Sequence, residues 1–105
     1  MELLTKELRE KFPKLYATEK VPAEEKVVIA KFFDPCGSWT WYAVEFDGED
    51  QFFGLVDGYE KELGYFVLSE LEEVRGPLGL PIERDLHFQP KMLEEIAPEM
   101  FREEA

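Results

Sequence analysis

The chain contains four short segments rich in β-branched and aromatic residues, separated by brief polar stretches. This pattern predicts four strands, over residues 26–33, 38–46, 51–56 and 65–68. The polar stretches at 34–37, 47–50 and 57–64 predict, in that order, a type I turn, a hairpin turn and a longer loop. None has room for a crossover helix, so we expect an antiparallel meander. Residues 86–88 predict a fifth strand at the sheet edge.

Apolar residues at helical spacing occur near the start of the chain. Leu4, Leu8 and Phe12 recur every four residues and would share one face of a helix. Thr5 is the expected N-cap, because its hydroxyl can accept a backbone hydrogen bond. Pro13 should end this helix, since a proline disfavours helical geometry in the residue before it.

A second short helix is predicted after the fourth strand. Residues 69–72 read Ser-Glu-Leu-Glu, a capping-box pattern with the serine as N-cap. The helix must end before Gly76 and Pro77, because this pair stops helices. Residues 76–81 then predict a rigid, apolar loop.

A last helix is predicted near the end of the chain. Pro90 suits its first turn, and its apolar face would carry Met92, Leu93 and Ile96. Pro98 interrupts the helical pattern, and residues 98–105 are expected to form a frayed tail.

Both faces of segment 38–46 are largely apolar. Strict alternation places these residues on two faces: Trp39, Trp41, Ala43 and Glu45 on one, and Thr40, Tyr42, Val44 and Phe46 on the other. A strand that is apolar on both sides is typically central and covered on both faces. The terminal helices are the available covers. We therefore expect most aromatic rings to form the core, leaving Tyr42, Tyr59 or one tryptophan as a partly exposed anchor.

These elements predict a single α+β domain over residues 1–105. Its architecture would be a four- to five-stranded, mostly antiparallel sheet with short N- and C-terminal helices packed on it. A chain of 105 residues that is 45% hydrophobic can form one core. Cys36 is the only cysteine, so the core must form without an internal disulfide.

Acidic residues outnumber basic ones by 24 to 12, which gives a formal net charge of −12. Residues 1–31 hold seven basic and six acidic residues, whereas residues 32–105 hold five basic and eighteen acidic ones. Such a surface repels phosphate backbones and anionic lipids, so neither nucleic acid nor a membrane is an expected partner. The first residues are charged and no apolar run approaches a membrane span, so we expect a cytoplasmic protein. The acidity would either keep the protein soluble or attract a basic partner.

Groups that could carry catalysis or bind metal are few. Residues 36–39, Cys-Gly-Ser-Trp, superficially resemble the papain-type cysteine signature, but they lack its second cysteine. Only one histidine, His87, could serve as a base. His87 with Glu83 and Asp85 would make a weak zinc site, because zinc usually recruits several histidine or cysteine ligands. Nucleotide-binding glycine motifs and the zinc-protease motif are also absent from the sequence. We therefore expect no catalytic residue, no metal ion and no cofactor.

Residues 70–85 form the most distinctive stretch, in which glycines and prolines frame Leu78, Leu80 and Ile82. Arg75 and Arg84 are expected to be held by nearby carboxylates; the nearest in sequence are Glu72, Glu83 and Asp85. The stretch could simply fix a loop over the sheet end, or it could form a recognition surface. Together with the loop at 57–64, it supplies eight candidate binding residues: Tyr59, Glu62, Arg75, Leu78, Leu80, Glu83, Arg84 and Asp85.

Several motifs resemble a bacterial family called domain of unknown function 2958. The longest is residues 75–88, Arg-Gly-Pro-Leu-Gly-Leu-Pro-Ile-Glu-Arg-Asp-Leu-His-Phe; shorter ones lie at 39–42, 53–56, 62–66 and 69–72. The resemblance covers roughly residues 3–90. It implies no activity and no catalytic residues, and Cys36 lies in none of its motifs. Members are often met on plasmids and other mobile elements, which implies an accessory role.

Three functional hypotheses follow. The first is a non-enzymatic module that binds another protein through the loops at 57–64 and 75–85. The second is an acidic mimic of DNA that occupies a nucleic-acid enzyme. The third is an enzyme with a carboxylate site, for which the abundance of acidic residues is a nonspecific signal. The oligomeric state does not follow from the sequence.

Overall fold

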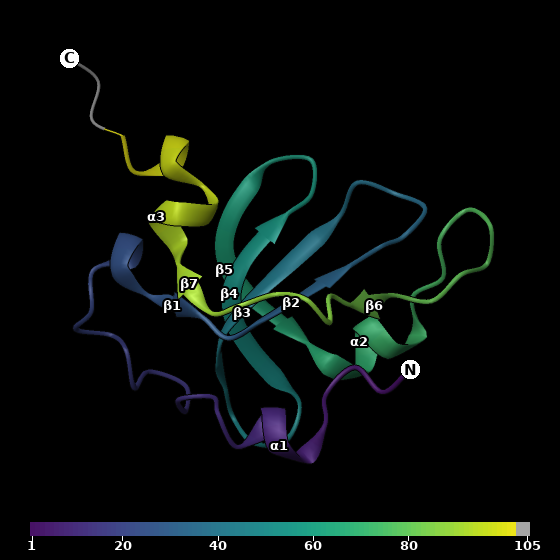
Figure 1. Cartoon of the computed structure of the whole chain (residues 1–105), viewed down its shortest axis with the longest axis horizontal. Helices are drawn as coiled ribbons and strands as arrows, with labels where there is room; N and C mark the ends of the chain where they lie inside the picture. The colour runs from purple at the N-terminus through teal and green to yellow at the C-terminus, as the bar shows by residue number, and fades with distance from the viewer. Residues whose placement is uncertain (103–105) are drawn as a thin grey trace.

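A five-stranded antiparallel sheet forms the body of the protein in the computed structural model, which describes residues 1–102. Its strands lie in the order β5-β4-β3-β2-β6 (Figure 1). Their bounds are β2 Ala30–Phe33, β3 Thr40–Phe46, β4 Gln51–Asp57, β5 Lys61–Val67 and β6 Glu83–Arg84. The central strand is β3, as its two apolar faces predict. The structure therefore confirms the α+β class and the antiparallel sheet.

Short elements surround this sheet. A second, two-stranded sheet pairs β1 (Val27–Val28) with β7 (Lys91–Met92). The helices are α1 Lys6–Arg9, α2 Leu68–Glu73 and α3 Leu93–Ile96, with 3₁₀ turns η1 Ala23–Glu25 and η2 Pro98–Met100. Figure 1 shows α1 near one end of the large sheet and α3 beside the small one. The predicted tail therefore begins with a helical turn, and its residues 103–105 lie outside the described part.

Two strand predictions were wrong in position. The region 57–64 was predicted to be a loop, but β5 begins at Lys61, so the β4–β5 connection is a tight turn. The edge strand was predicted at 86–88, but it lies at Glu83–Arg84, where it pairs with Phe32 and Phe33 of β2. Segment 26–33 is also divided between two sheets, because Val27 and Val28 pair with β7 while β2 pairs with β3.

Two helix starts also differ from the predicted ones. Ser69 is not the N-cap of α2, because the helix already begins at Leu68. The capping groups come from Asp50 in the β3–β4 turn. Its carboxylate accepts hydrogen bonds from the backbone N–H and the hydroxyl of Ser69, at 2.8 Å each. The last helix begins after β7 and does not include Pro90. At the N-terminus, Thr5 caps α1 as predicted, although this helix has only four residues.

The sheet buries one apolar cluster on each face. The larger cluster joins the N-terminal segment, α2 and the sheet; its largest members include Leu4, Phe12, Phe32, Trp41, Phe46, Phe52 and Phe66. The smaller one joins the C-terminal elements to the opposite face through Val28, Val44, Leu55, Leu93 and Ala97. The two terminal segments are thus the two covers that the alternation in β3 predicts. Most aromatic side chains belong to these two clusters or pack against them.

A β-bulge interrupts the alternation in the central strand. The pairing of β3 with β4 shifts between Ala43 and Glu45, so Phe46 joins the same cluster as Trp41. Strict alternation had placed Phe46 and Trp41 on opposite faces, and that prediction was wrong because the sequence gives no sign of the extra residue. A bulge of this kind adds one residue to one strand and turns the following side chains over.

Gly54 of β4 lies directly against the bulged strand. A Cβ atom at this position would be 1.9 Å from the carbonyl oxygen of Tyr42 and 3.1 Å from the Cα of Ala43. These neighbours are backbone atoms and cannot rotate away. Gly64, its partner on β5, has open space where a Cβ would be.

We predict that Gly54→Ala lowers the free energy of unfolding by about 3 kcal/mol, because the methyl group forces two strands apart. Gly64→Ala is the matched control and should change it by less than about 0.5 kcal/mol. Urea unfolding followed by circular dichroism measures both. Equal stability of the two variants would show that β3 and β4 can separate at little cost.

Glu45 follows the bulge and is buried, with 3% of its surface exposed. Its carboxylate accepts hydrogen bonds from the backbone N–H of Tyr16 at 2.9 Å and of Thr18 at 3.1 Å, and from the Thr18 hydroxyl. Lys26, also buried, donates to the Thr18 carbonyl and hydroxyl oxygens. This network fastens the irregular segment between α1 and β1 to the sheet, so the segment needs no secondary structure of its own.

We expect Glu45→Gln to destabilise the protein by about 2 kcal/mol, because the amide would direct its N–H₂ group at a backbone donor. The exposed Glu49 provides the control, and Glu49→Gln should change stability by less than about 0.5 kcal/mol. Thermal unfolding of both variants tests this. Stability unchanged in Glu45→Gln would mean that the segment is held by other contacts.

Candidate functional site

The eight candidate binding residues lie on three parts of the molecule. Tyr59 is in the β4–β5 turn and Glu62 is on β5. Arg75, Leu78 and Leu80 belong to the loop between α2 and β6, and Glu83, Arg84 and Asp85 to β6 and the residue after it. The structure therefore does not gather them into one site.

Three connections converge at one end of the large sheet. They are the β2–β3 turn (34–39), the β4–β5 turn (58–60) and the loop 76–80 (Figure 1), and we call them the loop end. The β2–β3 turn touches both of the others. A Cβ on Gly76 would lie 2.8 Å from the Asp34 carboxylate, and one on Gly58 would lie 2.4 Å from the Trp39 ring.

The loop 76–80 is closed on itself. The N–H of Gly76 donates to the carbonyl of Leu80 at 3.0 Å, and that of Gly79 donates to the carbonyl of Gly76 at 2.8 Å. Gly79 has a φ of +75°, which favours glycine. Leu78 and Leu80 are exposed, whereas Ile82 is buried. The predicted loop is present and closed by these hydrogen bonds, but the predicted apolar ridge loses its third member to the core.

Within residues 1–102, neither arginine of this region is held by a carboxylate, contrary to prediction. Arg75 donates from Nη1 to the carbonyls of Glu72 and Val74 at 2.9 Å each, and so satisfies the end of α2. Carbonyls at a helix C-terminus carry partial negative charge and attract a cation.

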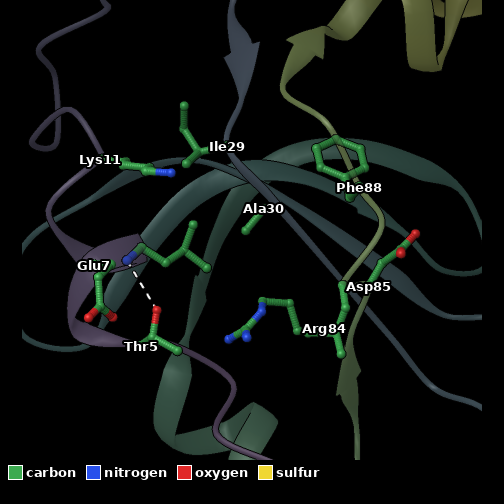
Figure 2. A pocket seen from close by; sticks show the side chains of 10 residues that line it. Thr5, Glu7, Lys11, Ile29, Ala30, Arg84, Asp85 and Phe88 are labelled. Carbon is green, nitrogen blue, oxygen red and sulfur yellow. Dashed lines mark hydrogen bonds between the residues drawn. The ribbon is translucent and has the colours of Figure 1, made fainter.

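Arg84 fastens the N-terminal segment to β6. Its Nη1 donates to the carbonyls of Glu2 and Leu3 at 2.8 Å each. Figure 2 shows the guanidinium group pointing into the hollow beside α1, while Asp85 points away from it. Alternation along β6 thus separates Arg84 from its neighbours Glu83 and Asp85.

We predict that Arg84→Ala lowers stability by about 1–2 kcal/mol, because two backbone carbonyls lose a charged donor beside the buried Leu3. The exposed Arg102 gives the matched control, and Arg102→Ala should be nearly neutral. Urea unfolding measures both. If both variants matched the wild type, the N-terminal segment would be held by its apolar contacts alone.

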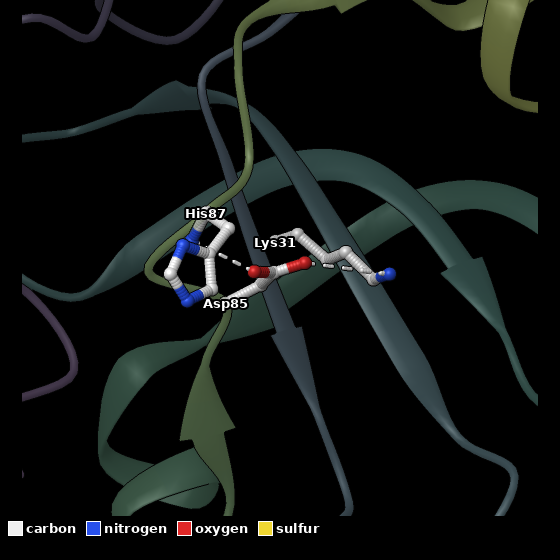
Figure 3. A network of polar contacts seen from close by, with 3 residues as sticks. All are labelled: Lys31, Asp85 and His87. Carbon is white, nitrogen blue, oxygen red and sulfur yellow. Dashed lines mark hydrogen bonds and ion pairs between the residues drawn. The ribbon is translucent and has the colours of Figure 1, made fainter.

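Two neighbouring residues contact the carboxylate of Asp85 (Figure 3). Its carboxylate accepts the backbone N–H of His87 at 2.9 Å and lies 3.7 Å from the ammonium of Lys31. His87 contacts Asp85 through its backbone N–H. Among residues 1–102, no group of three or more histidine, cysteine or acidic side chains could hold a metal ion.

The most exposed aromatic ring of the protein is at the loop end. Tyr59 is 95% exposed, and its ring meets the half-buried ring of Trp39 edge-on at 5.3 Å. The two rings line a pocket with Val56, Glu60 and Glu62. Sequence reasoning chose Tyr59 and Glu62 but did not include Trp39 or Glu60 among the candidates. The strand pattern allowed one tryptophan to be partly exposed but did not say which; Trp39 is half-buried and packs against the larger cluster, whereas Trp41 belongs to it.

The charges beside this pocket are uneven. Lys61 forms an ion pair with Glu99 of η2, and this hydrogen bond raises the pKa of Lys61 and lowers that of Glu99. Tyr42 is half-buried, and loss of solvent, followed by the charge of Asp57, raises its pKa. Lys61, the one lysine or arginine among the described residues 34–74, is therefore paired.

The protein is thus a small α+β domain without a metal cluster among its described residues, and two of its most exposed apolar side chains, Tyr59 and Leu78, lie on loops. Residues 3–96 match the family described as "Protein of unknown function (DUF2958)". The chain belongs to this family, which confirms the resemblance seen in its motifs. No curated protein and no solved structure matches the chain. No helix within residues 1–102 is long and apolar enough to cross a bilayer.

Proposed function

We propose that this protein is a non-enzymatic interaction module that binds another protein through its loop end. One observation carries the proposal: this end presents Tyr59 and Leu78, with 95% and 76% of their surface exposed, on short, internally bonded connections. Large apolar side chains that add nothing to the core are typical anchors of protein interfaces.

The rigidity of these connections favours binding. The β4–β5 turn closes with a hydrogen bond from the N–H of Gly58 to the carbonyl of Glu60, at 3.1 Å. The β2–β3 turn closes similarly between Gly37 and Asp34, at 3.2 Å. Because the loops are already ordered, little conformational entropy is lost when they meet a partner.

Charge indicates the chemistry of the partner. The chain has no lysine or arginine between residues 34 and 60, a span that contains two of the three connections and seven acidic residues. The basic residues of the N-terminal segment lie elsewhere; Arg9, for example, donates to the carbonyl of Gly48 at the opposite end of the sheet. An acidic surface with apolar anchors suits a basic partner and accelerates its approach.

The test is affinity capture from the native host by four variants of the tagged protein. Tyr59→Ala and Leu78→Asp should each lose the captured protein, because they remove anchors without disturbing the core. Tyr16→Ala and Leu86→Asp are the matched controls, since these side chains are 63% and 64% exposed away from the loop end. The controls should retain the partner, and all four should keep the wild-type melting temperature.

Equal capture by all four variants would contradict a role for the loop end. A captured protein that duplex DNA displaces equally from every variant would instead support mimicry of DNA by the acidic surface.

A further inference from the structure

The pocket at the β4–β5 turn has walls of two chemical kinds. Trp39, Tyr59 and Val56 provide rings and an aliphatic surface, and Glu60 and Glu62 provide carboxylates. Its volume is about 300 Å³, at the lower limit for sites that take small ligands. A single side chain of a partner suits this size better than a cofactor does.

The rings are held in place before any ligand arrives. Trp39 packs against the backbone of Gly58, where a Cβ would come within 2.4–2.7 Å of three ring atoms. Trp39 also contacts two other rings. Its ring centroid lies 6.1 Å from that of Trp41 and 5.3 Å from that of Tyr59, and the planes of Trp39 and Tyr59 meet at 82°. Glycine at position 58 therefore lets the indole pack closely against the turn, and the Tyr59 ring meets it edge-on.

The carboxylates beside the rings carry uncompensated charge. Glu62 pairs with Val56 across the strands, and Val56 pairs with Trp41, so these three share one face of the sheet. Lys61 points to the opposite face by alternation, where it pairs with Glu99. Between residues 1 and 102, the ion pairs of the protein involve neither Glu60 nor Glu62.

Aromatic faces and carboxylates attract the same kind of group. A ring face carries partial negative charge and binds a guanidinium or ammonium ion, most strongly when tryptophan or tyrosine provides it. A carboxylate adds a charge-assisted hydrogen bond to the same ion. An anionic or purely apolar group would leave the two glutamates repelled or unpaired.

We infer that the pocket formed by Trp39, Tyr59, Glu60 and Glu62 receives a cationic side chain, an arginine or a lysine, from the partner protein. This inference rests on the proposed function and specifies its chemistry. The cation neutralises Glu62 or Glu60, its stem lies along Val56, and the two rings flank it. The exposed leucines of the loop 76–80, which packs against the β2–β3 turn, then contact apolar residues of the same partner.

The experiment titrates ¹⁵N-labelled protein with the tripeptide N-acetyl-Gly-Arg-Gly-amide and follows the indole N–H resonances of Trp39 and Trp41. The Trp39 resonance should shift saturably, and the affinity should fall as salt is added. The same peptide with citrulline is the matched neutral control and should give no saturable shift. Citrulline keeps the shape of arginine and removes its charge.

Variants locate the binding site. Tyr59→Ala and Glu62→Gln should each weaken binding of the arginine peptide by at least about threefold, the size expected when a cation loses a ring or a charge at an exposed site. Glu73→Gln, at an exposed carboxylate of α2, should leave the affinity unchanged. An unchanged melting temperature excludes unfolding as the cause.

The inference is overturned if the citrulline peptide binds as well as the arginine peptide, if Trp39 shows no saturable shift, or if Glu62→Gln binds as tightly as the wild type. Failure here can be told apart from failure of the proposed function. If capture of the partner still requires Tyr59 and Leu78 but the arginine peptide does not bind, only the inference of a cationic side chain in the pocket is contradicted. Binding of the peptide, with capture unaffected by Leu78→Asp and Tyr59→Ala, contradicts the proposed interaction surface but leaves the affinity of the pocket for a cation standing.

Discussion

The bulge in the central strand is the constraint on which the rest of the structure depends. It inserts Val44 into β3 and shifts the pairing with β4, so that Phe46 faces the larger core and Glu45 meets the N-terminal segment. This is possible only because β4 carries a glycine at the contact, where any Cβ would strike the backbone of Tyr42. Without the shift, a buried carboxylate would occupy the larger core and a phenylalanine ring would face the backbone donors of residues 16–18.

The same constraint explains how a small chain covers both faces of its sheet. The helices are too short to bury much surface themselves, since α1 and α3 have four residues each. Irregular segments do the work, and they are held by particular polar contacts: Glu45 holds the segment after α1, and Arg84 holds the segment before it. Each contact satisfies backbone groups that secondary structure would otherwise satisfy.

The sequence predicted those features of the fold that depend on residues close together along the chain, and not those that depend on residues brought together by the fold. The central position of β3, the Thr5 cap and the turn at 34–37 depend on neighbours along the chain, and the pattern identified them. The bulge, the cap supplied to α2 by Asp50, and the carbonyl partners of Arg75 and Arg84 depend on backbone placed by the fold. Side-chain type alone suggested carboxylate partners for the arginines, because carboxylates are abundant in this sequence.

The candidate site shows the same division. Tyr59 and Glu62 were chosen as candidates because a tyrosine and an acid in a polar stretch have no core to join, whereas Trp39 was not singled out because the strand pattern does not distinguish it from its neighbour Trp41, which belongs to the core. One residue beyond the strand, the sheet ends and the ring rests on Gly58 instead. Its place at a strand end beside a glycine turn is therefore what leaves Trp39 half-buried, while Trp41 within the strand is buried. Whether a ring is buried thus depends on what the fold places beside it: Phe12 is buried although it lies outside any strand, and Tyr65 is 49% exposed although it lies in β5.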